Sequence, residues 1–256
     1  MAQIYRDAAK IAVFLEGWLA DALAASGAKG AALGLSGGVD SAALAAILRR
    51  VCAKDELLAV IMPAYSMPAD EEHARLAADA LDISAVKVDL SSIFDHCVKA
   101  MEACGGELSP LARANIKPRL RMATLYALAQ SRNFLVCGGG NKDELAFGYF
   151  TKHGDSGVDL LPFGDLLKGE VRALARYLGV PDAIVDKPPS AGLWEGQTDE
   201  AEMGVSYADL DLYLAGGETT PAVREKIESA ARRSEHKRNM PRIAVIPTQA
   251  AGASMR

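Results

Sequence analysis

The sequence predicts an α/β fold in which a parallel β-sheet is flanked by helices. Short apolar runs alternate with longer segments of helical composition, and this alternation implies parallel strands joined by right-handed crossovers. Glycine-rich turns follow two of the apolar runs, at residues 37–38 and 138–140. Because ligands of such sheets lie beyond the carboxyl ends of the strands, we expect both turns at one functional edge.

The composition is that of an ordinary globular protein. The 256 residues are 50% hydrophobic and 24% charged, with a net charge of -5, so nothing global indicates nucleic-acid binding. No apolar run reaches membrane-spanning length, and acidic residues interrupt the N-terminal stretch where a signal peptide would be apolar. We therefore expect a cytoplasmic protein that does not associate with a membrane. With no internal repeat or linker-like segment, a single domain over residues 1–256 is expected.

The first expected element is an amphipathic helix over residues 3–26. Its apolar side is expected to pack against the core, with self-association as the alternative. Next come a buried strand at residues 31–35, a glycine turn, and a helix from residue 41. The apolar side of the first helix is formed by Ile4, Ala8, Ile11, Leu15, Trp18 and Leu19.

Strands and helices alternate through the middle of the chain. Pro118 lies within a helical segment and should start or kink a helix there. Lys168 lies in the first turn of a later helix, where its charge opposes the helix dipole, so another interaction must favour it. The expected strands are 57–62, 85–88 and 134–137, and the expected helices are 69–81, 91–103, 109–131, 165–178 and one that opens at 197–200.

Residues 34–41 predict a phosphate-binding loop. A strand, a glycine turn and a helix start gather unpaired N–H groups and the positive end of the helix dipole at one point. Ser36 and Ser41 add hydroxyl donors. An Asp in such a loop repels phosphate unless it holds a divalent cation, which makes Asp40 a candidate Mg²⁺ ligand. The alternative is a plain glycine turn with Asp40 as the helix N-cap.

Three other segments contain candidate ligand-binding residues. Residues 148–159 are rich in charged groups and glycines without helical or strand periodicity, so an ordered loop that forms part of a site is expected. Basic residues gather at 113–121 and at 232–238. Each basic cluster is either an anion site or a solvated face.

Six segments, in this order, resemble the ammonia-dependent NAD synthetases. The first alone resembles the PP-loop of the ATP pyrophosphatase superfamily, and the later ones narrow the resemblance to this family. It implies a parallel-sheet homodimer that uses ATP, Mg²⁺ and ammonia to convert nicotinic acid adenine dinucleotide into NAD. The nicotinate carboxylate would attack the α-phosphate of ATP, and ammonia would then displace AMP. The segments are LSGGVDSA, NIKPRLRM, GGGNKDE, GYFTKHGDSGVD, KPPSAGLWEGQTDE and SEHKR.

The resemblance also implies roles for individual residues. Asp40 and Glu144 would bind Mg²⁺, and Lys152 and Lys168 are candidate catalytic cations, because the attack of one anion on another needs charge neutralisation. Asp155 is hypothesised to hold the incoming ammonium and take its proton. The implied ATP-binding residues are Gly34, Leu35, Ser36, Gly37, Gly38, Val39, Asp40, Ser41, Gly139, Lys168 and Ser190, and the implied dinucleotide-binding residues are Arg119, Lys152, Asp159, His236 and Lys237.

Three positions depart from the family pattern. Gly139, Pro118 and Gly192 stand where Thr, Ala and Asp are usual, which bears on ATP affinity and local geometry more than on the reaction class. One alternative is another PP-loop ligase, such as a GMP synthetase-like or tRNA-thiolating enzyme, but no catalytic cysteine motif or zinc spacing is present. The other is a nucleotide-binding regulatory protein without turnover, which the many charged site residues disfavour.

Overall fold

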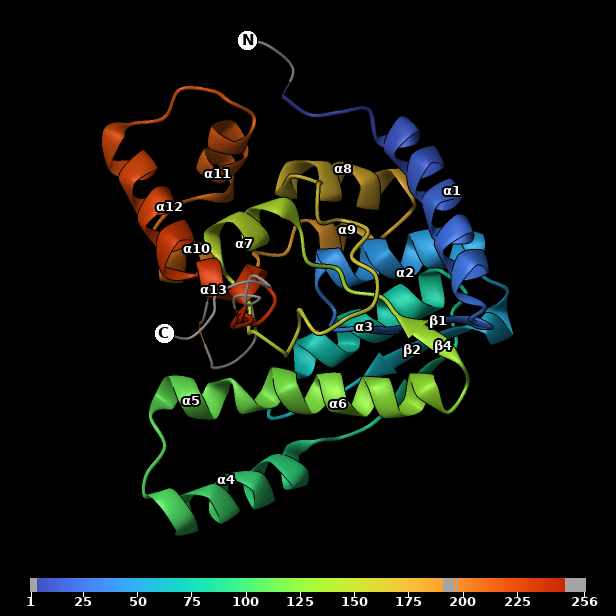
Figure 1. Ribbon diagram of the computed structural model, residues 1–256. Coiled ribbons are helices and arrows are strands. Elements are labelled where there is room, and N and C mark those ends of the chain that lie inside the picture. The colour runs from blue at the N-terminus through green and yellow to red at the C-terminus, as the bar shows by residue number, and fades with distance from the viewer. Residues whose placement is uncertain (1–3, 191–195, 197, 247–256) are drawn as a thin grey trace, which may run out of the picture.

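The computed structural model describes residues 4–190, 196 and 198–246. A four-stranded parallel sheet with the order β3-β2-β1-β4 lies at its centre (Figure 1). The expected parallel α/β fold is therefore confirmed. The strands are β1 (Gly30–Gly34), β2 (Leu57–Ile61), β3 (Ala85–Lys87) and β4 (Phe134–Val136).

Helices cover both faces of the sheet. Alternate residues of β1 point to opposite sides, so that Leu33 joins one hydrophobic cluster and Ala32 joins the other. Burial on both faces explains why the two central strands β1 and β2 are continuous apolar runs. One face is covered by α1 (Ala8–Ser26), α2 (Val39–Val51), α3 (Pro68–Ala80), α8 (Lys168–Tyr177) and α9 (Asp182–Val185), and the other by α6 (Ile116–Gln130), against which α4 (Ser91–Gly105) packs.

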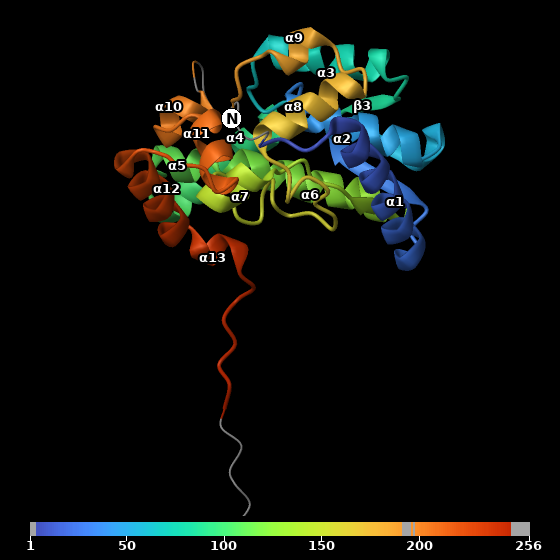
Figure 2. The ribbon, with the colours of Figure 1, turned by 90° about the horizontal axis from the view of Figure 1, so that it is seen from above.

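The C-terminal helices form a smaller cluster beside the sheet (Figure 1). They bury their own apolar core, which includes Met203, Leu210 and Ile227. After the last helix, residues 239–246 extend away from the body of the protein (Figure 2). The helices are α7 (Lys142–Phe147), α10 (Asp199–Met203), α11 (Tyr207–Leu214), α12 (Pro221–Arg233) and α13 (Glu235–Arg238).

The N-terminal segment ties α8 to α11. The Tyr5 hydroxyl donates a 2.7 Å hydrogen bond to Asp211 on α11. The Arg6 guanidinium donates to both carboxylate oxygens of Glu170 on α8, at 2.8 and 2.7 Å. Since Glu170 is buried, this contact holds the residues just before α1 against the start of α8.

Several element boundaries differ from the sequence expectation. The segment 109–131 is two helices, α5 (Pro110–Ala114) and α6, and Pro118 lies in the first turn of α6, where a missing N–H is tolerated. The helix expected at 165–178 begins only at Lys168, because Glu170 reaches back to the Leu167 N–H. The predicted apolar side of the first helix was partly wrong, since Trp18 is 39% exposed.

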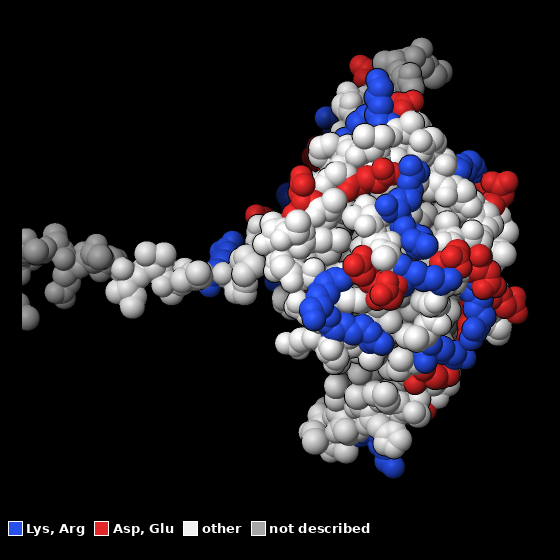
Figure 3. All heavy atoms as spheres, turned by 90° about the vertical axis from the view of Figure 1, so that its right-hand side faces the viewer, with Lys and Arg blue, Asp and Glu red and all other residues white. Residues whose placement is uncertain are grey.

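Acidic and basic side chains are interspersed on the surface. Figure 3 shows both signs close together on the face that lies to the right in Figure 1. Pairs such as Arg50–Glu16 and Lys54–Asp82 contribute to this mixture. Among the described residues, no helix combines the length and the apolar character needed to cross a bilayer.

Candidate functional site

A cavity of about 570 Å³ opens beyond the carboxyl ends of β1, β2 and β4. β1 lies between β2 and β4 in the sheet. From β1 the chain first builds the sheet outward in one direction, through β2 and β3, and then returns to add β4 on the opposite side of β1, so the direction of strand addition reverses there. Such a reversal creates a crevice in which ligands of α/β sheets bind. The two glycine turns, at residues 37–38 and 138–140, meet at this crevice, as the sequence predicted.

The loop between β1 and α2 has the geometry of a phosphate site. Ser41 Oγ accepts a hydrogen bond from the Ser36 N–H at 3.1 Å and donates to the Gly38 carbonyl at 3.0 Å. Gly37 has a φ of +81°, and a Cβ there would lie 2.1 Å from the Asp70 carbonyl oxygen, so only glycine fits. Gly34, Leu35, Ser36, Gly38, Val39, Asp40 and Ser41 all line the cavity.

Asp40 is not the N-cap of α2. That position is occupied by Gly38, which has no side chain to cap the helix, so the plain-turn alternative with Asp40 as N-cap is wrong. Asp40 instead accepts hydrogen bonds from Asn141 Nδ2 at 2.9 Å and from Lys168 Nζ at 2.5 Å. Its carboxylate therefore points across the cavity toward segments more than a hundred residues away.

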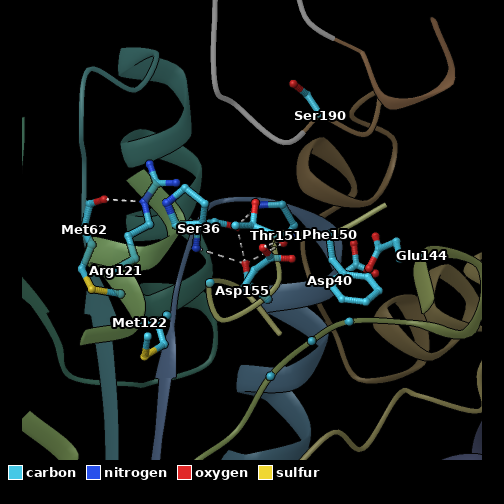
Figure 4. Close-up of a pocket in the computed structure, with 18 of the residues that line it drawn as sticks. Ser36, Asp40, Met62, Arg121, Met122, Glu144, Phe150, Thr151, Asp155 and Ser190 are labelled. Atoms are coloured by element: carbon cyan, nitrogen blue, oxygen red, sulfur yellow. Dashed lines mark hydrogen bonds between the residues drawn. The ribbon is translucent and has the colours of Figure 1, made fainter. Parts of the chain in front are cut away.

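Lys168 joins Asp40 to Glu144. Its Nζ lies 2.5 Å from Asp40 Oδ2 and 3.4 Å from Glu144 Oε1, and its side chain is only 2% exposed. The two carboxylates converge in the close-up of Figure 4. The Tyr207 ring lies 4.7 Å from the same Nζ and screens it from water. These contacts are the additional interaction that a lysine at a helix start requires.

Asn141 and the start of α7 set the direction of Glu144. Asn141 Oδ1 accepts from the Glu144 N–H at 3.0 Å, and Glu144 Oε2 accepts from the Asn141 N–H at 3.1 Å. This reciprocal capping box fixes the helix start directly after the β4 glycines. A Cβ at Gly139 would lie 3.2 Å from the Asp40 carbonyl, so the glycine turn packs on the first turn of α2.

Among the described residues, acidic groups outnumber Lys168 in this part of the cavity. Burial alone would lower the pKa of Lys168, but the charges of Asp40 and Glu144 raise it, so Lys168 stays protonated. Burial raises the pKa of Glu144 to about 7, against the opposing effect of Lys168. Asp199, which accepts the Tyr207 hydroxyl at 2.9 Å, adds a third carboxylate nearby. This excess of negative charge favours an additional cation.

Asp155 lies in the loop 148–159, which forms one wall of the cavity. Its carboxylate accepts the Thr151 N–H at 2.8 Å and is accessible from the cavity (Figure 4). The surrounding protein raises the pKa of Asp155, while the Thr151 N–H and the nearby Lys237 and Arg121 lower it. Arg121 is held by the Met62 carbonyl at 3.0 Å and by Ser66 Oγ at 3.1 Å.

Four of the five predicted dinucleotide-binding residues are linked. Lys152 Nζ donates to the His236 carbonyl at 2.5 Å, and the Arg119 guanidinium donates to the Lys152 carbonyl at 3.4 Å. Lys237 Nζ donates to the carbonyls of Gly148 and Phe150 at 2.9 and 2.8 Å. The basic cluster near residue 236 thus contacts the loop 148–159.

Asp159 lies apart from this group. Its two carboxylate oxygens accept hydrogen bonds from the Tyr126 hydroxyl at 2.9 Å and from the Val136 N–H at 2.8 Å. It is exposed and does not line the cavity formed by the described residues. Ser190 does line the cavity, from the segment after α9. The departure at Gly192 lies outside the described residues.

Sequence reasoning missed several residues that shape the site. Asn141, Tyr207 and Asp199 orient the carboxylates and the lysine, as described above. Asn141 and Asp199 lie within quoted motifs, but nothing in their spacing shows that they face Asp40 or Tyr207. Tyr207 comes from a helix that was not predicted, and its ring position depends on the packing of α11.

Comparisons with known proteins place this arrangement in one family. The NH(3)-dependent NAD(+) synthetase of Carboxydothermus hydrogenoformans is 47% identical over 233 residues, which cover 91% of this chain and 96% of that protein. The structure of an NMN synthetase from Francisella tularensis matches with a TM-score of 0.87 and 35% identity, and covers 94% of this chain and 99% of that one. An NH3-dependent NAD synthetase from Campylobacter jejuni matches with a TM-score of 0.77 and 28% identity, over 94% of this chain and 100% of that one.

The family model described as NAD synthase matches residues 11–241. This range contains the phosphate loop, both carboxylates, the lysine and the C-terminal basic cluster described above. The chain belongs to the NAD synthase family.

Proposed function

We propose that this cavity carries out the ATP-dependent amidation of nicotinic acid adenine dinucleotide to NAD, with ammonia as the nitrogen donor. The observation that carries the proposal is the Lys168 ammonium held between Asp40 of the phosphate loop and Glu144. The curated relatives, which are NH(3)-dependent NAD(+) synthetases, support the same reaction. The enzyme is thus a ligase that forms a C–N bond and releases AMP and pyrophosphate.

In the first step, a nicotinate carboxylate oxygen bonds to the α-phosphorus of ATP. The bond from that phosphorus to the bridging oxygen breaks, and pyrophosphate leaves with the electron pair. The backbone N–H groups and hydroxyls of residues 36–41 would hold the phosphates, and Gly139 and Ser190 would contact ATP from the other walls. Lys168 would neutralise charge as the two anions approach.

Mg²⁺ would be held by Asp40 and Glu144. The residues fit the ion, because both offer carboxylate oxygens beside Lys168 and because the carboxylates of Asp40, Glu144 and Asp199 outnumber that one lysine. Within the described ranges no group of three His, Cys, Asp or Glu forms a complete metal cage, which suits an ion that takes its other ligands from phosphates and water. When bound, the ion would supply positive charge to the triphosphate.

In the second step, ammonia displaces AMP from the adenylated carboxyl group. Ammonium has to lose a proton before its nitrogen can attack, and Asp155 would both attract the cation and take the proton. Desolvation by the surrounding cavity wall raises the pKa of Asp155, which makes its carboxylate a better base at neutral pH. Asp155 lines the cavity, and an ammonium held there would lie beside a carboxyl group bound in the same cavity.

The dinucleotide would extend from the cavity over the linked basic group. Lys237 lines the cavity itself, and Arg119, Lys152 and His236 continue from it through the contacts described above. The positive charges of Arg119, Lys152 and Lys237 suit the dinucleotide diphosphate. Lys152 is also proposed as a cation that assists adenylation. Asp159 is proposed as a contact at the exposed edge of this surface.

We propose a homodimer in the cytoplasm. Val13 and Phe14 on α1 are 67% and 69% exposed, which leaves an apolar strip for a second copy to cover. A reducing compartment would keep the four cysteines as thiols, and they are free in the described part of the chain.

A second acceptor is nicotinic acid mononucleotide. The observation that favours it is the match to the structure of an NMN synthetase from Francisella tularensis. Both acceptors present the same nicotinate carboxylate, so the two reactions would differ only in the contacts made by the rest of the nucleotide.

One assay tests both acceptors. Purified protein receives ATP, Mg²⁺, ammonium chloride and either the dinucleotide or the mononucleotide, and the products are separated by chromatography. The proposal expects NAD and AMP in equal amounts with the dinucleotide. NMN formed in preference to NAD would support the second acceptor. AMP formed only with another acceptor would indicate a different ligase, and nucleotide binding without AMP would indicate a regulatory protein.

A further inference from the structure

Lys187 and Asp70 form an ion pair in the cavity that the site described above does not use. Lys187 Nζ lies 2.6 Å from Asp70 Oδ1, and the two side chains are 24% and 23% exposed. Both residues line the cavity. The pair is therefore shielded from bulk water on one side and accessible to a ligand on the other.

The pair lies beside the phosphate loop. Asp70 is in the first turn of α3, and its carbonyl oxygen packs so closely on Gly37 that no Cβ fits between them. Gly37 is the turn residue of the loop itself. The Asp70 side chain therefore presents Lys187 at the flank of residues 36–38.

The backbone that carries Lys187 is well anchored. Ile184 and Val185 of α9 are fully buried, and α9 packs against α2 and α3. Figure 2 shows α9 beside α3 at the edge of the structure. Lys187 follows two residues after Val185. Its position is therefore set by the packing of α9 on α2 and α3, as well as by the contact of its ammonium with Asp70.

We propose that Lys187 is a second phosphate-binding cation, which contacts the β- and γ-phosphates and the pyrophosphate that they become, while Asp70 positions it. This inference rests on the proposed function. An ammonium has three N–H donors, and Asp70 accepts one of them. Two donors then remain for phosphate oxygens.

The charge distribution explains why a second cation is needed. Lys168 already contacts both Asp40 and Glu144, so much of its charge is balanced before ATP arrives. When the bond between the α-phosphorus and the bridging oxygen breaks, the electron pair stays on the pyrophosphate, while the carboxylate oxygen bonds to phosphorus. A cation beside the leaving pyrophosphate stabilises the negative charge that grows there.

The alternative is that the ion pair only tethers the segment after α9 to α3. The two explanations differ in their charge dependence. Removing either partner breaks a tether equally. A phosphate contact is lost only with the lysine, and removal of the aspartate takes away a negative charge that repels the ligand.

The experiment measures binding of inorganic pyrophosphate, with Mg²⁺ present, to the full chain by isothermal titration calorimetry. Lys187→Met should weaken binding by about tenfold or more, the usual effect of losing a charge-assisted hydrogen bond. Asp70→Asn should bind as tightly as the unaltered protein or more tightly, because the amide oxygen can still accept the Lys187 N–H and keep it in position while the repelling charge is gone. Lys187→Arg should retain most of the affinity. Lys54→Met is the matched control, since Lys54 pairs with the exposed Asp82 and does not line this cavity.

Two results would overturn the inference. One is unchanged pyrophosphate binding by the Lys187→Met protein, and the other is an equal loss in the Lys187→Met and Asp70→Asn proteins. Thermal melting of each variant shows whether it is folded, and if Lys187→Met fails to fold, Lys187→Gln replaces it. NAD formation by the unaltered protein is measured separately, so either result can overturn this inference while the proposed function stands.

Discussion

Lys168 and Asp40 form an ion pair at 2.5 Å although 128 residues separate them in the chain. The lysine is 2% exposed and the aspartate 22%, so the cavity reaches the carboxylate more easily than the ammonium. Lys168 therefore fixes where Asp40 and Glu144 point, in addition to any contact with ATP. Several consequences of this arrangement can be measured.

Replacing Lys168 with Met should impair both stability and turnover. Two converging carboxylates would lose their shared cation, and breaking a buried pair costs about 3 kcal/mol of unfolding free energy. AMP formation should fall by about a hundredfold or more. Urea unfolding and a coupled AMP assay measure the two effects. Lys142→Met is the control, because its pair with the exposed Asp165 should contribute less than about 1 kcal/mol. Equal effects in both variants would contradict the prediction.

Gly37→Ala should destabilise the protein, whereas Gly38→Ala should not. A Cβ at Gly37 would lie 2.1 Å from the Asp70 carbonyl and the residue has a positive φ, while a Cβ at Gly38 meets only Ser36 Oγ at 3.5 Å. We expect a loss of about 2 kcal/mol or more for the first change and less than about 0.5 kcal/mol for the second. Denaturant unfolding of the two proteins checks the difference, and similar midpoints would show that the loop relaxes.

Asp143→Asn should stabilise the protein at pH 8 more than at pH 5. Burial and the neighbouring Asp211 raise the pKa of Asp143 from 3.8 to about 8. The folded state therefore keeps a proton that the unfolded state has lost, and stability falls as the pH rises from about 4 to about 8. The asparagine amide oxygen can still accept the Lys168 backbone N–H and carries no buried negative charge. We therefore expect a gain in unfolding free energy on the order of 1 kcal/mol at pH 8. Urea unfolding at both pH values tests this, and a pH-independent difference would refute it.

Asp155→Asn should slow amidation more than adenylation. The amide oxygen can still accept the Thr151 N–H, so the loop should keep its shape, but the side chain can no longer attract ammonium or take its proton. Single-turnover experiments can follow pyrophosphate release and NAD formation separately. Asp82→Asn provides the comparison, since the Asp82 side chain is 73% exposed and lies outside the cavity lining of the described residues. Equal loss of both steps in Asp155→Asn would argue against an ammonium site.

Phe14→Glu tests the proposed role of α1 in self-association. The side chain is 69% exposed, so the change should leave the monomer folded, but a charge at the centre of an apolar interface opposes dimer formation. Sedimentation should show a shift from dimer to monomer. An unchanged dimer would place the interface elsewhere. Asp21→Asn on the same helix serves as the control, since it introduces no charge and no apolar surface.

The strands and the phosphate loop could be predicted because their determinants are local. An apolar run followed by glycines and a helical segment defines β1, its turn and α2 without reference to the rest of the chain. The same is true of β4, an apolar run followed by glycines. The helix α7 was not predicted, although its start has a local signal, since Asn141 and Glu144 cap each other over three residues.

Other features depend on tertiary packing and were not predictable. Trp18 matches the apolar period of α1 but lies beyond the surface that α2 and α8 cover. Lys187 meets Asp70 across 117 residues, and Tyr207 meets Lys168 through the packing of α11. Local sequence rules contain no information about these pairings, since each depends on how segments distant in the sequence pack together.

The N-terminal segment has a consequence for how the protein is made. Tyr5 leaves the ribosome early, but its partner Asp211 is synthesised near the end of the chain. Asp40 is likewise synthesised long before its partner Lys168. Translation must therefore pass through a long interval in which the nascent chain holds a phosphate loop without its balancing lysine. Such late closure of distant contacts makes folding slow, and it offers chaperones a period in which to act.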